Sequence, residues 1–199
     1  MLIEHDTMKL EKMQEKDILQ VAELLSNAFA EKFTEETGLS KETAKRLMKL
    51  LWLEEYEMFG MQPYVLKEAD EVVGGFGVTL NQRKKITVSF VAKVLAAVRV
   101  LGMKQLLLFV KEAAKTNRDP DRDELYIDFI AVKESRRNQH IGHRLMEEIE
   151  QLKEKHAETL KLSLYVLKDN ERARHLYTKY GFEECREHER KSYYFMVKK

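Results

Sequence analysis

The spacing of apolar residues changes several times along the chain, and each change marks a predicted boundary between a strand and a helix. In the first half, apolar and polar residues alternate in three stretches, as in half-buried strands. These predicted strands are 7–13, 63–69 and 72–80. Elsewhere in this half, apolar residues recur every three or four positions, as on one face of a helix. These predicted helices are 17–32 and 40–60, and a tight turn at Asp70-Glu71 joins the last two strands.

The second half alternates strands and helices. Its predicted elements are a strand at 125–132, a helix at 139–156, a strand at 160–167, a helix from 170 that ends at Gly181, and a terminal hairpin of 183–188 with 192–197. A strand, a helix and a strand in this order predict a right-handed crossover that leaves the two strands parallel. Because the sequence has no internal repeat, we expect one mixed α/β domain over residues 1–199.

The stretch 88–110 is apolar apart from Lys93, Arg99 and Lys104. It predicts two helices that break near Gly102. A membrane span needs about 20 mainly apolar residues, so the interspersed charges argue against stable insertion into a bilayer. We expect these helices to cover the sheet or a substrate cleft. The alternatives are a basic amphipathic surface that rests on a membrane, or a contact within a homodimer.

The amino-acid composition argues against several classes of function. The 199 residues carry 35 Lys and Arg against 34 Asp and Glu, so the chain lacks the overall positive charge of a protein that binds nucleic acid. The single cysteine, Cys185, excludes an intrachain disulfide and is expected to be a buried structural thiol. The N-terminus lacks a secretory signal, which favours the cytoplasm. No metal site is predicted, because four histidines lack metal-ligand spacing: His5, His156, His175 and His188.

One junction predicts a ligand. The apolar strand 125–132 leads through a basic turn into the helix that follows, and the first backbone N–H groups of a helix have no partner within it. Those groups and the helix dipole favour a bound anion. The turn also gathers four positive or titratable side chains, namely Arg136, Arg137, His140 and Arg144. A phosphate-bearing ligand is therefore expected here.

Two motifs give a resemblance to a known family. The turn Arg137-Asn-Gln-His-Ile-Gly142 and the later run Asn170-x-x-Ala173-x-x-Leu176-Tyr177-x-x-Tyr180-Gly181-Phe182 are similar to those of the GCN5-related N-acetyltransferase (GNAT) family. The resemblance covers about 125–182, and the helix-helix-strand-strand order before it is also similar. His140 stands where the family pattern has its first glycine. The resemblance implies a central mixed, partly parallel twisted sheet flanked by helices, with an extra helical insertion around 86–118.

The resemblance also implies an activity, the transfer of an acetyl group from acetyl-CoA directly to a primary amine of a small molecule, a peptide or a protein. In that family the pyrophosphate of this co-substrate lies on the turn before the central helix, and its pantetheine arm lies beside the central strand. The cofactor-binding residues expected on this basis are Ile130, Ala131, Val132, Arg137, Asn138, Gln139, His140, Ile141, Gly142, His143, Asn170 and Ala173. Tyr177 is expected to protonate the departing thiolate.

A base for the amine is the second catalytic expectation, because the nucleophile must lose a proton as it attacks. Asp128 is the candidate, since a carboxylate within an apolar strand is costly unless it is paired or used. Alternatively, Asp128 pairs with a cation at the sheet edge or binds a cationic substrate. Tyr177 and Asn170 also have structural alternatives, a core aromatic and a helix N-cap.

Two further alternatives concern function. His140 at a glycine position also fits a CoA-binding regulatory or interaction module that has lost turnover. A group of acidic residues forms either a rim that attracts a cationic amine or ordinary solvated helix faces. These residues are Glu31, Glu35, Glu36, Glu54, Glu55 and Glu57.

Overall fold

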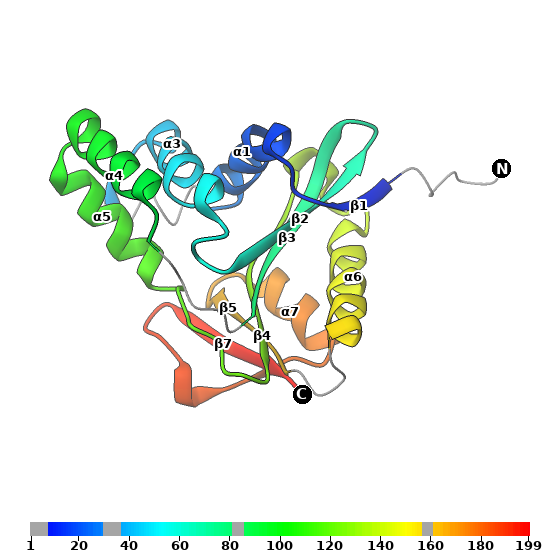
Figure 1. The fold of residues 1–199 in the computed structure, drawn as a ribbon. Coiled ribbons are helices and arrows are strands. Elements are labelled where there is room, and N and C mark those ends of the chain that lie inside the picture. The colour runs from blue at the N-terminus through cyan, green and yellow to red at the C-terminus, as the bar shows by residue number, and fades with distance from the viewer. Residues whose placement is uncertain (1–7, 30–36, 81–85, 157–160) are drawn as a thin grey trace.

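The computed structural model describes residues 8–29, 37–80, 86–156 and 161–199. Its centre is a seven-stranded sheet with the strand order β1-β2-β3-β4-β5-β7-β6 (Figure 1). The strands are β1 (Met8–Lys12), β2 (Met61–Glu68), β3 (Glu71–Leu80), β4 (Glu124–Val132), β5 (Lys161–Leu167), β6 (Glu183–Glu184) and β7 (Tyr193–Lys198). β4 and β5 run parallel, and the other paired neighbours run antiparallel. The predicted mixed, partly parallel sheet is confirmed.

Helices cover both faces of this sheet. They are α1 (Ile18–Ala28), α3 (Lys41–Leu51), α4 (Val88–Leu101), α5 (Met103–Ala114), α6 (Ile141–His156) and α7 (Glu171–Lys179). α1, α3, α4 and α5 lie together on one side, and α6 and α7 lie on the other (Figure 1). Two hydrophobic cores result: Phe129 and Ala131 of β4 join the core under α1 and α3, while Leu125 and Ile127 join the core under α6.

A bulge in β4 lets this one strand contribute buried side chains to both hydrophobic cores. Ile127 pairs with Val78 on β3. The next pair joins Phe129 to Gly77, so Asp128 is an extra residue on β4. The extra residue puts Phe129 on the side of the sheet opposite to Ile127. Gly77 makes room for this arrangement, because a Cβ there would lie 2.5 Å from a ring carbon of Phe129.

The helix predicted at 40–60 is shorter in the structure. α3 ends at Leu51, and a 3-10 helix, η2 (Leu53–Glu55), follows it. Leu53 is fully buried and Met58 is nearly so, because the chain turns inward to bury both side chains instead of continuing along the surface. Gly60 completes the turn with a φ of 69°. The prediction was therefore wrong beyond residue 51. The first helix is also shorter than predicted, because α1 ends at Ala28 with Phe29 as its C-cap. The predicted end at 32 itself lies outside the described residues.

The terminal hairpin is also smaller than predicted. Of the strand predicted at 183–188, only β6 (Glu183–Glu184) pairs with β7, and a 3-10 helix, η4 (Arg186–His188), follows it. The hydroxyl of Tyr165 donates a 3.0 Å hydrogen bond to the carbonyl of His188, which holds this turn against β5. Cys185, expected to be buried, is only partly buried beside it. The predicted break near Gly102 is confirmed, since α4 ends there and α5 begins.

Candidate active site

The two parallel strands part toward their carboxyl ends. β4 pairs with β5 from Glu124 to Ile127, although β4 continues to Val132 and β5 to Leu167. Beyond Ile127, the edge of β4 that faces β5 therefore borders an opening. Ligands of open α/β sheets bind outside the carboxyl ends of the strands. This opening is the first candidate site.

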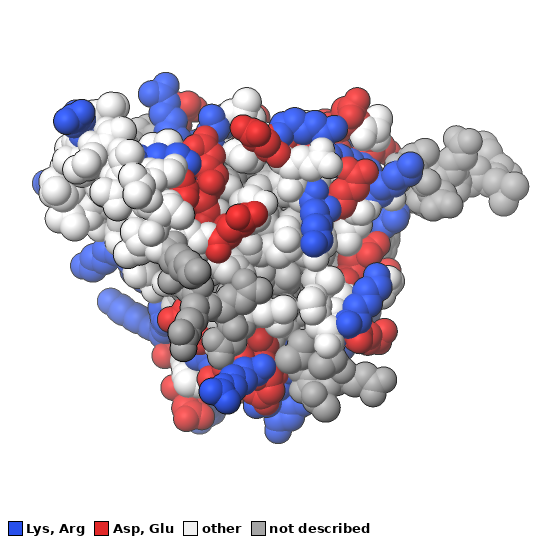
Figure 2. Space-filling view, viewed as in Figure 1, with Lys and Arg blue, Asp and Glu red and all other residues white. Residues whose placement is uncertain are grey.

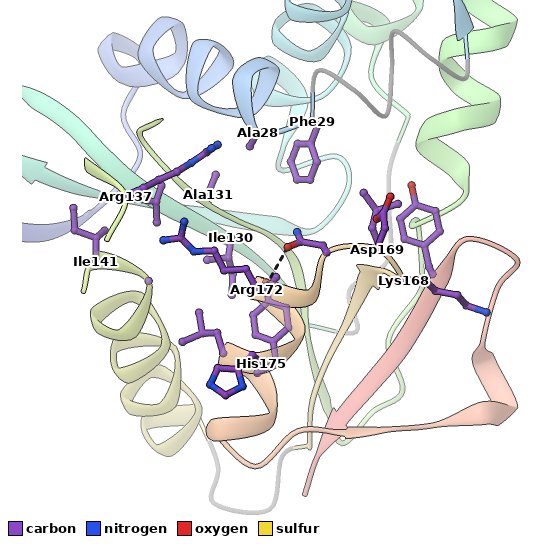
Figure 3. Close-up of a pocket in the computed structure, with 18 of the residues that line it drawn as sticks. Ala28, Phe29, Ile130, Ala131, Arg137, Ile141, Lys168, Asp169, Arg172 and His175 are labelled. Atoms are coloured by element: carbon purple, nitrogen blue, oxygen red, sulfur yellow. Dashed lines mark hydrogen bonds between the residues drawn. The ribbon is translucent and has the colours of Figure 1, made fainter. Parts of the chain in front are cut away.

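A cavity of about 1030 Å³ occupies the opening (Figure 3). It is lined by the end of β4, the turn into α6, the loop from β5 to α7, one face of α7, and parts of α1 and α5. Every predicted cofactor-binding residue lines it except Gln139. The side-chain amide of Gln139 instead donates to the carbonyl of Ser135 at 3.5 Å. The other predicted cofactor-binding residues therefore all line one cavity.

One end of the cavity is suited to an anion. The N-terminus of α6, at Ile141, lines it together with the turn before it. Figure 3 shows Arg137 entering from that turn and Arg172 from α7. The sequence analysis missed Arg172, although it stands next to Ala173 within the second motif. Gly142 lets the two helices approach, because a Cβ there would lie 3.3 Å from a methyl carbon of Leu176 on α7.

Two of the four basic side chains predicted for this turn bind distant parts of the chain, whereas Arg137 forms an ion pair within the turn, with Glu134 at 3.8 Å. Arg136 lines the cavity but forms ion pairs with Glu68 and Glu71. Arg144 donates a 2.8 Å hydrogen bond to the carbonyl of Met8 on β1, and it is not among the cavity residues. Arg144 therefore ties α6 to the sheet edge. The sequence could not show this contact, because it joins residues far apart along the chain.

The charge of the lining is strongly one-sided. Seven Lys and Arg residues line the cavity against two carboxylates, Glu112 and Asp169. The seven are Lys115, Arg136, Arg137, Lys168, Arg172, Lys179 and Lys191. Since a concave site focuses the field of the charges around it, the cavity attracts a ligand with several negative charges. The near-neutral chain as a whole gives no such preference.

Comparison with known proteins assigns the fold. Residues 22–182 match the family model described as Acetyltransferase (GNAT) family. The chain belongs to the GNAT family. The resemblance inferred from the two motifs is thereby confirmed. A search of the curated proteins finds no matching sequence.

Solved acetyltransferase structures share the architecture despite low sequence identity. An N-acetyltransferase from Staphylococcus aureus Mu50 is similar with a TM-score of 0.66 and 15% identity, over 96% of this chain and 100% of that one. The PaiA N-acetyltransferase from Thermoplasma acidophilum, in complex with coenzyme A, has a TM-score of 0.61 and 14% identity, over 96% and 98%. YncA, a putative acetyltransferase from Salmonella typhimurium with its cofactor acetyl-CoA, has 0.56 and 10%, over 98% and 94%.

The second GNAT motif forms α7 and its cap. The side-chain oxygen of Asn170 accepts a 3.1 Å hydrogen bond from the backbone N–H of Ala173, so the N-cap interpretation is correct, and both residues also line the cavity. Tyr177 lies on α7, seven residues after Asn170. It is 8% exposed and packs in the core under α6, with its ring 6.0 Å from that of Phe182. It lines the cavity as well. Burial raises the pKa of the Tyr177 hydroxyl, which keeps it protonated at neutral pH.

Asp128 does not share this position. It is the extra residue of the β4 bulge, and its carboxylate accepts a 2.7 Å hydrogen bond from the hydroxyl of Thr79 on β3. Asp128 is not among the described residues that line the cavity. Its carboxylate also helps to raise the pKa of the buried Tyr126, although desolvation is the larger cause. The role of Asp128 as the base stays a prediction.

A different carboxylate lines the cavity. Glu112, on the inner face of α5, is 3% exposed. One of its oxygens lies 2.5 Å from the ammonium of Lys115, and the other accepts a 3.5 Å hydrogen bond from Tyr193. All three residues line the cavity. The sequence analysis missed Glu112, although its spacing from Leu106 and Phe109 places it on the buried face of the helix.

The acidic rim is not a feature of this cavity in the described residues. Glu54 and Glu55 form ion pairs with Lys93 at 3.1 and 2.6 Å. Glu55 also accepts hydrogen bonds from Thr87 at 3.0 Å and Ser89 at 2.8 Å, and the Lys93 hydrogen bond is the main cause that lowers its pKa. These two residues fasten α4 to η2. Glu31, Glu35 and Glu36 lie outside the described residues.

Proposed function

We propose that this GNAT protein binds acetyl-CoA and transfers its acetyl group directly to a primary amine. The observation that carries this proposal is the course of the cavity. It runs from the basic N-terminus of α6, past the open edge of β4, to the buried carboxylate of Glu112. This course supports a polyanion at the first end and, at the second, an amine that donates to Glu112, which Lys115 contacts at 2.5 Å. Coenzyme A and acetyl-CoA are the ligands of the GNAT structures from Thermoplasma acidophilum and Salmonella typhimurium.

The residues present fit acetyl-CoA. Backbone N–H groups from Asn138 to His143 and the guanidinium groups of Arg137 and Arg172 would hold the phosphates. The open edge of β4 from Ile130 to Val132 offers backbone hydrogen bonds to the amide-containing arm. The cavity volume of about 1030 Å³ is at the upper end of the roughly 300–1,000 Å³ of small-molecule sites.

Acetyl-CoA supplies a thioester carbonyl that an amine nitrogen can attack. In the proposed transfer, the C–N bond forms, the C–S bond breaks, and the departing thiolate takes the proton of the Tyr177 hydroxyl. Tyr177 then regains a proton from solvent through the open cavity. Glu112 holds the positively charged acceptor in the cavity. The proton that the amine loses is assigned to a carboxylate, for which Asp128 remains the proposal from sequence. No covalent acyl-enzyme is needed, because both substrates meet in one cavity.

Release of free thiol from acetyl-CoA tests this function. A panel of polyamines, amino acids, aminoglycosides and peptides, each beside a matched alcohol, should give turnover with one class of amine and none with the alcohols. Replacing Glu112 with Gln keeps its size and removes its charge, so KM for the amine should rise roughly tenfold while KM for acetyl-CoA stays unchanged. Asp128→Asn is the matched variant, and loss of kcat in it with KM unchanged would identify the base.

Two results of that experiment would contradict the proposal. Calorimetry that detects coenzyme A binding, with no thiol release over the whole panel, would favour a CoA-binding module without turnover. Failure to bind coenzyme A at all would exclude both functions.

His140 gives a separate test of the phosphate end. His140 has a φ of 59°, in the left-handed region that glycine adopts freely and other residues adopt at a cost of about 1 kcal/mol or more. We expect His140→Gly to bind coenzyme A at least as tightly as the wild type in calorimetry, because the strain is relieved and a phosphate can approach the backbone. Binding weakened tenfold or more would instead show that the imidazole itself contacts the ligand.

A further inference from the structure

Exposed apolar side chains gather on the insertion. Among the described residues, nine large hydrophobic side chains are exposed, and all but Leu19 belong to the segment 86–110. These eight are Ile86, Val88, Val91, Leu95, Val100, Met103, Leu107 and Val110. We call them the hairpin face, after the helical hairpin that α4 and α5 form. Such clustering marks an interaction site, since scattered exposed apolar residues are normal but contiguous ones are not.

The fold does not require the hairpin face to be apolar. On α4, Val94, Ala97 and Leu101 already pack inward, while Val91 and Leu95 point the other way along the helix. α5 repeats the arrangement, with Leu106 and Phe109 inside and Met103, Leu107 and Val110 outside. Both helices are therefore apolar on two faces. A helix that is apolar all round is normally covered on both sides.

The charge around the hairpin face has one sign. Residues 86–111 contain Lys93, Arg99, Lys104 and Lys111 and no Asp or Glu, in a chain with 34 acidic residues. Lys93 is bound to Glu54 and Glu55 beneath α4. Arg99, Lys104 and Lys111 are exposed. In Figure 2 the surface over α4 and α5, at the upper left, is mostly white, with blue side chains on its outer side and red ones on its right, toward the rest of the molecule.

We propose that the hairpin face docks this protein on the surface of a membrane that contains anionic lipid. An apolar helical face with a cationic border matches the interface of such a bilayer, where apolar side chains enter the acyl boundary and cations meet the headgroups. A second copy of the chain fits less well, since a symmetric dimer through this face would bring the same cations together. Docking is peripheral, because none of the described helices is long and apolar enough to cross a bilayer.

Docking would place the active site near the lipid. Glu112 lies on α5, whose outer side carries part of the hairpin face, and Lys115 is the C-cap of this helix. Both residues line the cavity. The inference does not depend on acetyl transfer, since it rests on the surface alone. It can therefore fail or succeed independently of the proposed function.

Vesicle flotation with the full chain tests the proposal. The protein should float with vesicles of phosphatidylcholine and phosphatidylglycerol, bind phosphatidylcholine alone much less, and be released by high salt. Arg99→Glu with Lys104→Glu should weaken binding by about 25-fold or more, since each cation near such a surface contributes roughly fivefold. Leu95→Gln with Leu107→Gln should weaken it at least tenfold by removing apolar contact.

Matched controls lie elsewhere on the surface. Leu19→Gln removes an exposed leucine of α1 that is 60% exposed, and Lys41→Glu reverses an exposed cation of α3. Both should float like the wild type, with folding of every variant checked by circular dichroism. Equal binding to neutral vesicles, or none to anionic ones, would overturn the proposal. A dimer in light scattering that the Leu95 and Leu107 changes dissociate, without vesicle binding, would assign the hairpin face to a second copy instead.

Discussion

Replacing Tyr177 with Phe is expected to lower kcat for acetyl transfer by about 100-fold, the lower part of the range for general acid catalysis. The hydroxyl is the only atom removed, and Tyr177 lies against the cavity in the core under α6. Burial raises its pKa, so the phenol is protonated at neutral pH. The raised pKa also makes it a weaker acid, so the proton transfers only as negative charge develops on the leaving sulfur. The alkaline limb of the activity profile should consequently not come from Tyr177.

Steady-state thiol release gives kcat and KM, and calorimetry gives coenzyme A affinity, which should change less than about twofold because the ring remains. Tyr64→Phe is the matched control, since Tyr64 lies on β2, stacks on Phe76 and is not among the cavity residues. Its activity should equal that of the wild type. Unchanged turnover in Tyr177→Phe would remove the proposed proton donor and favour a purely structural tyrosine.

Replacing Glu124 with Ala is expected to lower the free energy of unfolding by about 3–5 kcal/mol, as when one partner of a buried ion pair is removed. The Glu124 side chain is 4% exposed and that of Arg118 is 13% exposed. The Glu124 carboxylate accepts two 3.1 Å hydrogen bonds from Arg118 and one of 2.8 Å from the backbone N–H of Asp121. The hydroxyl of Ser163 on β5 also donates to it. The substitution would leave the Arg118 guanidinium without this partner and loosen the loop into β4.

The effect should depend on pH. Burial alone would raise the pKa of Glu124, but the hydrogen bonds from Arg118, Asp121 and Ser163 outweigh it and lower the pKa below 4.5. A carboxyl group with a lowered pKa stabilises the folded state fully above its unfolded pKa and loses that contribution as the pH falls through the folded value. The difference between wild type and variant should thus be constant near neutrality and shrink below about pH 4.5.

Urea denaturation at several pH values measures this difference. Glu154→Ala, an exposed position on α6, is the control and should stay within about 0.5 kcal/mol of the wild type. A loss of less than about 1 kcal/mol in Glu124→Ala would contradict the importance assigned to the buried pair.

Local patterns predicted much of this molecule. The period of apolar residues located β3, β5 and α7 closely, and the break at Gly102 followed from a single glycine between two apolar runs. Errors arose where burial elsewhere overrode the local pattern. Leu53 and Met58 continue the helical spacing of α3, yet the chain turns inward so that both are buried.

The candidate site divides in the same way. The proposed phosphate end lies on two short motifs whose geometry is local, a turn into a helix and a capped helix. The sequence alone predicted them at Arg137–Gly142 and Asn170–Ala173. At the proposed acceptor end, α5 and β7 meet at Glu112 and Tyr193, which are 81 positions apart. Hydrophobic pattern and motif spacing cannot predict a contact between residues so far apart in the sequence.

The sequence by itself therefore determined the mixed α/β class and the family resemblance, and it predicted the anion site at the start of α6, since these depend on hydrophobic period and on backbone groups close along the chain. Only the tertiary structure decided the divergence of β4 from β5, the partners of Asp128 and Glu112, and the exposure of the hairpin face. These features depend on which distant segments pack together and which faces they leave uncovered.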